Sequence, residues 1–254
     1  MGVTETHSRN AMSTVATNSL ASLETPALGR VPPLQSGDHL SRVEFERRYH
    51  ASPAHLKAEL IEGIVYIMAP VTEPGHARPH LRFGTWLGTY EAYTPGTIGG
   101  DNGSIRLDLD NMPQPDAYLR IDSDYGGQSK LSDDKYVQGA PDLVAEIAAS
   151  SASYDLHEKL RVYRRNGVGE YVVWRVWDRA VDWFRLEEGQ YVSQKPDNQG
   201  IHKSHNFPGL WLDSAALLAG DQRRVLAAVQ QGIASPEHAN FVAELERRRA
   251  ARGT

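Results

Sequence analysis

The segment 143–148, LVAEIA, constrains the fold most, because every residue except Glu146 is apolar or small. Successive side chains of a strand point to opposite faces, so a strand that is apolar on both faces must be covered on both. We therefore predict a buried central strand here, in a sheet that has helices packed against it.

The flanking patterns predict an α/β or α+β domain with a mixed sheet. Ser41 and Glu44 have the spacing of a capping box, which predicts a helix that runs to about Tyr49. The segment AELIEGIVYIMAP predicts a hairpin, and apolar residues at helical spacing predict a core-facing helix over 76–93. Further strands are expected at 105–110, 116–119, 171–177, 180–189 and near Tyr191, and further helices at 154–165, capped by Ser153, and at 213–252.

Composition excludes several classes of protein. The 254 residues contain no Cys, so disulfides, thiolate metal sites and a cysteine nucleophile are excluded, and any metal needs oxygen ligands or His. No apolar run approaches the ~18 residues of a membrane span. The net charge of -5 means that nucleic-acid binding would require a local basic patch.

The chain divides into three expected parts. Residues 1–37 are polar and aperiodic and predict a disordered leader, 38–212 form the folded domain, and 213–254 form a helical extension. The extension ends in Arg247, Arg248 and Arg249, for which an oligomerisation arm, a nucleic-acid contact and a solvated helix are alternatives. The missing secretory signal and the missing Cys favour the cytoplasm.

Isolated acids are the candidate functional residues. Burial of the Glu146 carboxylate among apolar neighbours costs several kcal/mol unless something compensates. Mg²⁺ is one compensation, with Asp116, just after Pro115, as a second ligand. An Arg partner or a solvated edge is the alternative. Glu59 on the hairpin is a third candidate acid, and Glu62 is its alternative.

Lys159 is the candidate cation, because it follows the strand that holds Glu146. It could position the attacking water and offset charge on a phosphate, or form a helix-surface ion pair with Asp155. His76 is a candidate for a supporting position beside the site. Arg161, Arg164 and Arg165 form either a phosphate-binding cluster or a solvated face, and we expect Tyr171, Trp174, Trp177 and Trp183 in the core.

An ordered series of motifs resembles the Uma2 (Uma-two) family of restriction-endonuclease-like proteins, within the PD-(D/E)xK nuclease superfamily. The resemblance covers about Leu40 to Leu186. Its motifs are AELIEG, Met68-Ala69-Pro70, a helix opening near His76, Pro115-Asp116, APDLVAEI, Asp155 with Glu158-Lys159-Leu160, and GVGEY.

The resemblance implies a restriction-endonuclease-like core and a Mg²⁺-dependent phosphodiesterase site, with Mn²⁺ as a substitute. Asp116 and Glu146 match the metal ligands, and Glu59 and Lys159 complete the implied catalytic set. The lysine of E-x-K should stand at Ala148, so Lys159 on the following helix would replace it. Arg175 and Val176 also depart from the family's usual Asp-Pro.

The leading hypothesis is a Mg²⁺-dependent endonuclease acting on DNA. The alternatives are a catalytically weak nuclease-fold scaffold and a phosphohydrolase of small phosphoesters. DNA is the expected partner, no membrane is expected, and a second copy of the chain is a candidate, because a dimer can cut both strands of a two-fold substrate.

Overall fold

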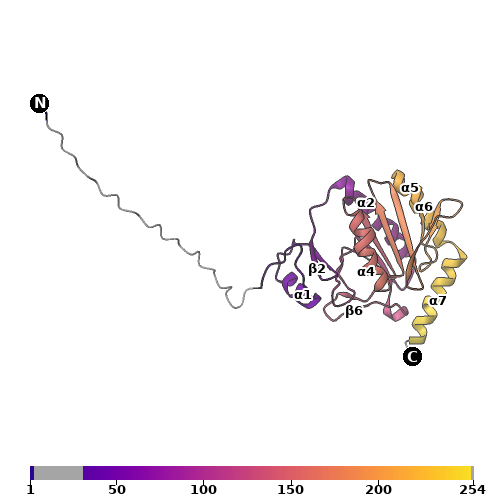
Figure 1. The fold of residues 1–254 in the computed structure, drawn as a ribbon. Coiled ribbons are helices and arrows are strands. Elements are labelled where there is room, and N and C mark those ends of the chain that lie inside the picture. Colours follow the sequence, from indigo (N-terminus) through magenta and orange to yellow (C-terminus); the bar gives the residue numbers. More distant parts are fainter. Residues whose placement is uncertain (3–30, 253–254) are drawn as a thin grey trace. The chain divides into compact units, whose positions relative to one another are not determined.

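The computed structural model describes residues 1–2 and 31–252 (Figure 1). The chain divides into two units, Met1–Val31 and Pro32–Thr254, and every helix and strand below belongs to the second unit. The disordered leader predicted for residues 1–37 therefore falls mostly outside the described residues. No helix in the described part is long and apolar enough to cross a membrane.

A mixed six-stranded sheet forms the centre of the second unit, in the order β11-β10-β9-β8-β5-β3. The strands are β3 (Thr97–Asp101), β5 (Ala117–Ile121), β8 (Leu143–Ala148), β9 (Glu170–Arg175), β10 (Ala180–Glu187) and β11 (Gln190–Ser193). Strand β8 runs parallel to β9 and antiparallel to β5, and all six of its residues are buried. The prediction of a buried central strand in a mixed α/β fold is confirmed.

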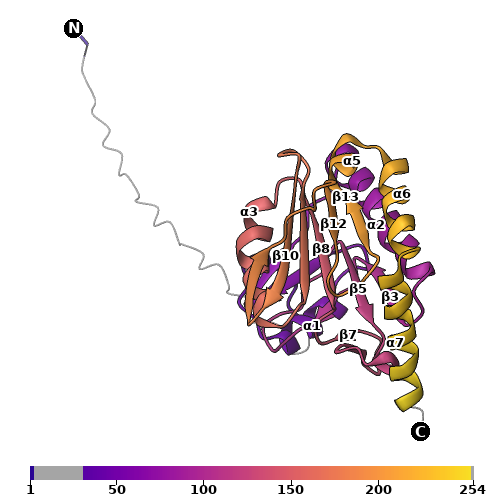
Figure 2. The same cartoon turned by 90° about the vertical axis from the view of Figure 1, so that its right-hand side faces the viewer.

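Helices cover both faces of this sheet (Figures 1 and 2). One face packs against α2 (Arg78–Ala92), α5 (Ser214–Ala219), α6 (Gln222–Ile233) and α7 (Pro236–Arg252). The other face packs against α3 (Ala152–Tyr154), η3 (Asp155–Lys159) and α4 (Leu160–Arg165), and against β4 (Ile105–Arg106) and β7 (Val137–Gln138). Strand β6 (Lys130–Leu131) completes a small sheet with β4 and β7.

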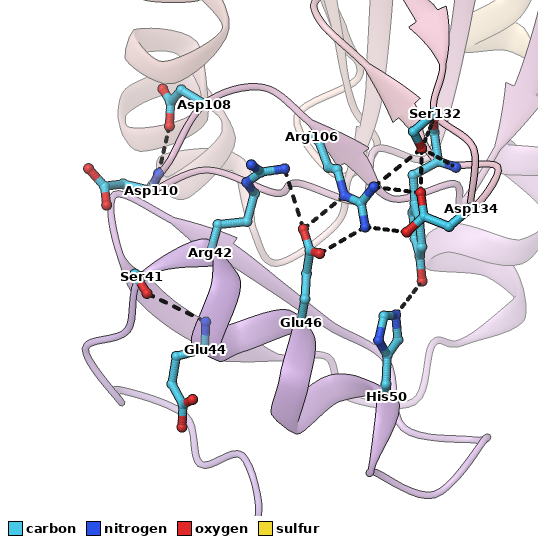
Figure 3. Close-up of polar contacts among 11 residues, drawn as sticks. Ser41, Arg42, Glu44, Glu46, His50, Arg106, Asp108, Asp110, Ser132 and Asp134 are labelled. Carbon is cyan, nitrogen blue, oxygen red and sulfur yellow. Dashed lines mark hydrogen bonds and ion pairs between the residues drawn. The ribbon is translucent and has the colours of Figure 1, made fainter.

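Helix α1 (Arg42–His50) and the hairpin of β1 (Ala58–Ile61) and β2 (Ile64–Ile67) share a third, smaller core. The Ser41 side chain accepts the Glu44 amide, but the Glu44 carboxylate binds Arg47 and Arg48 and does not complete the capping box. Arg106 ties α1 to the small sheet by binding Glu46 and Asp134 at once (Figure 3).

Three sequence predictions need correction near the site. The strand expected over 105–110 ends at Arg106, because Asp108 accepts the Asp110 amide and closes a turn instead. The helix expected over 154–165 begins at Ala152, so Ser153 lies inside it. The helix over 76–93 is preceded by a π-helical turn, η1 (Glu73–Ala77).

The C-terminal prediction of one helix is also wrong, since residues 214–252 form three. Gly220 ends α5 with a φ of 77°, a left-handed conformation that favours glycine, and Pro236 begins α7. Strands β12 (Ile201–Lys203) and β13 (Trp211–Asp213) pair with each other and were not predicted. Residues of α5, α6 and α7 belong to the same core as α2, including Leu217, Val229 and Leu245.

Candidate active site

Four predicted site residues meet at one end of the sheet. Glu59 lies on β1, Asp116 directly before β5, Glu146 on β8, and Lys159 at the end of η3. Glu59, Glu146 and Lys159 are each less than 5% exposed. Residues up to 100 positions apart in the chain thus share one buried polar cluster.

Lys159 is the centre of this cluster. Its Nζ lies 3.0 Å from Oε1 of Glu146, 3.1 Å from Oε1 of Glu59 and 3.8 Å from Oδ1 of Asp155. The lysine comes from the helix after the strand that holds Glu146, and its amine lies beside the Glu146 carboxylate. A long, flexible side chain makes this reach feasible.

The local sequence explains why Lys159 points inward. Asp155, Lys159 and Tyr163 are spaced by four residues, so a helix presents them on one face, and this face packs against the sheet. The turn that holds Asp155 and Lys159 is π-helical, a form that is rare and frequently found at functional sites.

Asp116 is held by β8 and by two histidines. Its Oδ2 accepts the Ile147 amide at 2.7 Å, and its Oδ1 lies 2.7 Å from Nε2 of His76. Nε2 of His80, one helical turn further on, lies 2.6 Å from the Asp116 carbonyl oxygen. The Asp116 amide points to Oε2 of Glu146 over a long 3.4 Å, so the two predicted metal ligands are neighbours.

The site holds more carboxylates than cations, and the pKa values follow this imbalance. Burial, together with the charges of Asp155, Asp116 and Glu59, raises the pKa of Glu146 well above its usual value, although Lys159 opposes the shift. Burial also raises the pKa of Asp155 to about 6. Burial alone would lower the pKa of Lys159, but attraction to Glu146, Glu59 and Asp155 outweighs it and raises the pKa.

Asp116 differs from the other acids, because its pKa is lowered. Burial works against this shift, but the hydrogen bond and charge of His76 and the Ile147 amide outweigh burial. The pKa values of the two neighbouring acids, Asp116 and Glu146, are therefore shifted in opposite directions. Such contrasting acids are frequent at functional sites.

The sequence reasoning missed two tyrosines that bind the acids. The Tyr163 hydroxyl donates to Oε1 of Glu146 at 2.8 Å, and the Tyr154 hydroxyl donates to Oε1 of Glu59 at 3.2 Å. Neither tyrosine was among the candidate site residues. The four-residue spacing from Asp155 to Tyr163 was the signal that could have identified Tyr163.

The cluster lines a pocket of about 390 Å³ whose wall includes Glu59, Asp116, Glu146 and Lys159. A larger pocket of about 670 Å³ shares the segment 67–71, His76 and Asp116 with it, and is also lined by Lys57 and His80. The acids are buried in the protein and yet reachable from a cleft.

Asp116 and Glu146 fit a hard divalent cation. Both present oxygen, and the excess of negative charge that raises the pKa of Glu146 is what a cation would relieve. No group of three or more His, Asp or Glu side chains among residues 1–2 and 31–252 is arranged as a metal cage. Mg²⁺ in proteins commonly uses one or two carboxylates and several waters.

Other candidates lie outside the cluster. Glu62 is exposed in the hairpin turn and pairs with Arg165, so Glu59 is the hairpin acid that reaches the site. Arg164 and Arg165 contact Gln190 and Glu62 on a solvated helix face. Tyr171, Trp174 and Trp183 are buried as expected, but Trp177 is 61% exposed, and its assignment to the core is wrong.

Comparisons with known proteins identify a family and a similar fold. No curated protein matches the chain. A crystal structure described as "a putative nuclease belonging to DUF820" from Anabaena variabilis is similar in fold, with a TM-score of 0.50 and 11% sequence identity. The match covers 72% of this chain and 97% of that chain. The model of the Uma2 family, described as "Putative restriction endonuclease", matches residues 42–215. The chain therefore belongs to the Uma2 family.

Proposed function

We propose that this chain is a Mg²⁺-dependent endonuclease that hydrolyses phosphodiester bonds of DNA, with Mn²⁺ as a substitute. The observation that carries the proposal is the meeting of Asp116, Glu146 and Lys159 in one pocket at the end of the central strand. Paired carboxylates beside a buried lysine provide both ligands for a metal and a positive charge for a phosphate.

Each residue has a distinct role in this proposal. Asp116 and Glu146 would hold the cation, which would act as a Lewis acid on the phosphate and lower the pKa of a bound water. Lys159 then turns from Glu146 toward the phosphate or the attacking water, and stabilises the developing charge. Glu59, which pairs with the lysine in the present arrangement, orients water, and His76 holds the Asp116 carboxylate in position.

The test is the nicking of supercoiled plasmid DNA with Mg²⁺ or Mn²⁺, compared with EDTA. We expect cleavage by the wild type and a loss of at least about 1,000-fold in Asp116→Ala and Glu146→Ala, because each variant removes one of the two carboxylates proposed to hold the metal. Glu62→Ala is the matched control, since it removes a hairpin acid outside the pocket. Full activity of both site variants would contradict the proposal.

A scaffold without catalysis is the second candidate, and one observation favours it. Lys159 already pairs with Glu146 and Glu59, so the cluster is partly satisfied without a metal. Calorimetry with Mg²⁺ separates the candidates, because the nuclease should bind the ion at millimolar concentration and lose that binding in Glu146→Gln. Turnover of mononucleotides without turnover of polymers would instead indicate a small-phosphoester hydrolase.

A further inference from the structure

Trp177 is an unusual surface residue. It lies in the turn between β9 and β10, and 61% of it is exposed, whereas Trp86, Trp174 and Trp183 are buried. In proteins that bind single-stranded nucleic acids, aromatic rings beside basic side chains stack on bases.

Three arginines surround this tryptophan. Arg78, Arg82 and Arg179 line a hollow of about 310 Å³ together with Trp174 and Trp177, and no acidic side chain lines it. Arg78 binds Glu73 outside the hollow, at 2.9 Å from its Nε. Arg82 and Arg179 form no ion pair with any carboxylate in the described chain, so their charge is not neutralised.

This Arg–Trp surface, formed by Arg78, Arg82, Arg179 and Trp177, adjoins the candidate active site across η1. Gly75 in η1 lies between the two, because a Cβ there would be 3.1 Å from the Trp177 ring and 3.4 Å from the Ala149 side chain. Ala149 lines the active-site pocket. His76, which follows Gly75 in the chain, binds Asp116.

The charge of the whole molecule makes this surface informative. With a net charge of -5, the chain as a whole repels a polyanion, and its active site is acidic. A cationic surface beside the site would reduce this repulsion for an approaching polynucleotide. The Arg–Trp surface is cationic, lies beside the pocket and contains an aromatic ring.

We propose that a DNA strand that enters the active site continues across η1 onto the Arg–Trp surface. Arg82 and Arg179 bind its phosphates, and Trp177 stacks on an unpaired base. This inference rests on the proposed function and adds a substrate class to it, since only an unpaired base exposes a face for stacking. The preferred substrate is therefore DNA with a single-stranded segment beside the scissile bond.

The first test is fluorescence anisotropy in EDTA with a labelled single-stranded oligonucleotide. We expect the double variant Arg82→Glu and Arg179→Glu to bind at least about tenfold more weakly and to show a smaller salt slope, by about 0.7 for each phosphate that the variant no longer binds. Lys130→Glu is the matched control, because Lys130 is exposed, forms no ion pair in the described chain and lies on β6, at the other end of the sheet from α5 (Figure 1).

A second variant keeps the test decisive if the double variant does not fold. Trp177→Ala removes an exposed ring, and we expect at least about a fivefold loss of affinity for single strands and a smaller loss for blunt duplex. Tyr93→Ala, also an exposed aromatic, should bind as the wild type does. With Mg²⁺, the variants of the surface should raise KM and leave kcat unchanged, because they touch no reacting atom.

The outcomes separate the two proposals. Unchanged affinity in the charge variants and in Trp177→Ala would overturn this inference, even if the wild type cleaves DNA. Weakened binding in those variants, with a wild type that cleaves nothing, would support the surface and reject the nuclease.

Discussion

Two charge clusters in this molecule, one partly exposed and one buried, are built on opposite principles. In the first, Arg106 binds Glu46 and Asp134, and Arg42 also pairs with Glu46, so two cations face two acids (Figure 3). In the second, Lys159 is shared among Glu59, Glu146 and Asp155. The first cluster holds α1 in place, whereas the second has negative charge left over.

The pKa values show the consequence of this difference. The hydrogen bond of Arg106 lowers the pKa of Asp134, while burial and neighbouring acids raise those of Glu146 and Asp155. A cluster that serves only stability gains from charge balance. An excess of carboxylates over cations in a buried site leaves these acids repelling one another, and a bound cation would reduce that repulsion.

The largest predicted effect comes from removing each cluster's cation. Lys159→Met leaves buried acids without a partner, and we expect the free energy of unfolding to fall by about 3 kcal/mol or more. Arg106→Met should cost about 1 to 2 kcal/mol, because Asp134 can turn to solvent, and should retain DNA cleavage. Urea unfolding at pH 7 in EDTA measures both. A larger loss in Arg106→Met would reverse the comparison.

The next effect is in the pH dependence of stability. The pKa of Asp155 is raised to about 6 in the folded protein from 3.8, so the folded state holds a proton that the unfolded state releases. Stability should therefore fall as pH rises from about 4 to 6, by roughly 2 kcal/mol, and Asp155→Asn should flatten this fall. Asp134 has a lowered pKa, so its contribution is instead lost as pH falls. Urea unfolding at several pH values is the measurement, and an unchanged slope in Asp155→Asn would contradict the assignment.

The smallest predicted effect is the change in folding stability when one glutamate of each cluster is replaced by glutamine, and it has opposite signs in the two clusters. Glu146→Gln removes repulsion, and we expect it to stabilise the metal-free protein by about 1 kcal/mol while abolishing cleavage. Glu46→Gln loses a charged partner of Arg106, and should destabilise by about 1 kcal/mol. Thermal unfolding checks both signs. Added Mg²⁺ should raise the melting temperature of the wild type and leave that of Glu146→Gln unchanged.

Much of the fold could be predicted from the sequence, because the decisive signals are local. The apolar run around Glu146 identified the central strand, and helical spacing of Phe83, Trp86 and Tyr90 identified α2. Breaks that depend on one residue were missed, since Gly220 and Pro236 end one helix and begin another. Trp177 was wrongly predicted to lie in the core, because the alternation of apolar and polar residues in a strand can continue into the turn that follows it.

The sequence by itself determined the kinds of side chain available: oxygen ligands, one well-placed lysine, no thiol, and a negative overall charge. Only the tertiary structure decided which of them meet. Contacts between Glu59, Asp116, Glu146 and Lys159 depend on the pairing of distant strands and on a helix that crosses back over the sheet. The shifted pKa values depend on burial, and the Arg–Trp surface depends on which residues lie close together in space. Burial and distance in space cannot be read from the spacing of residues along the chain.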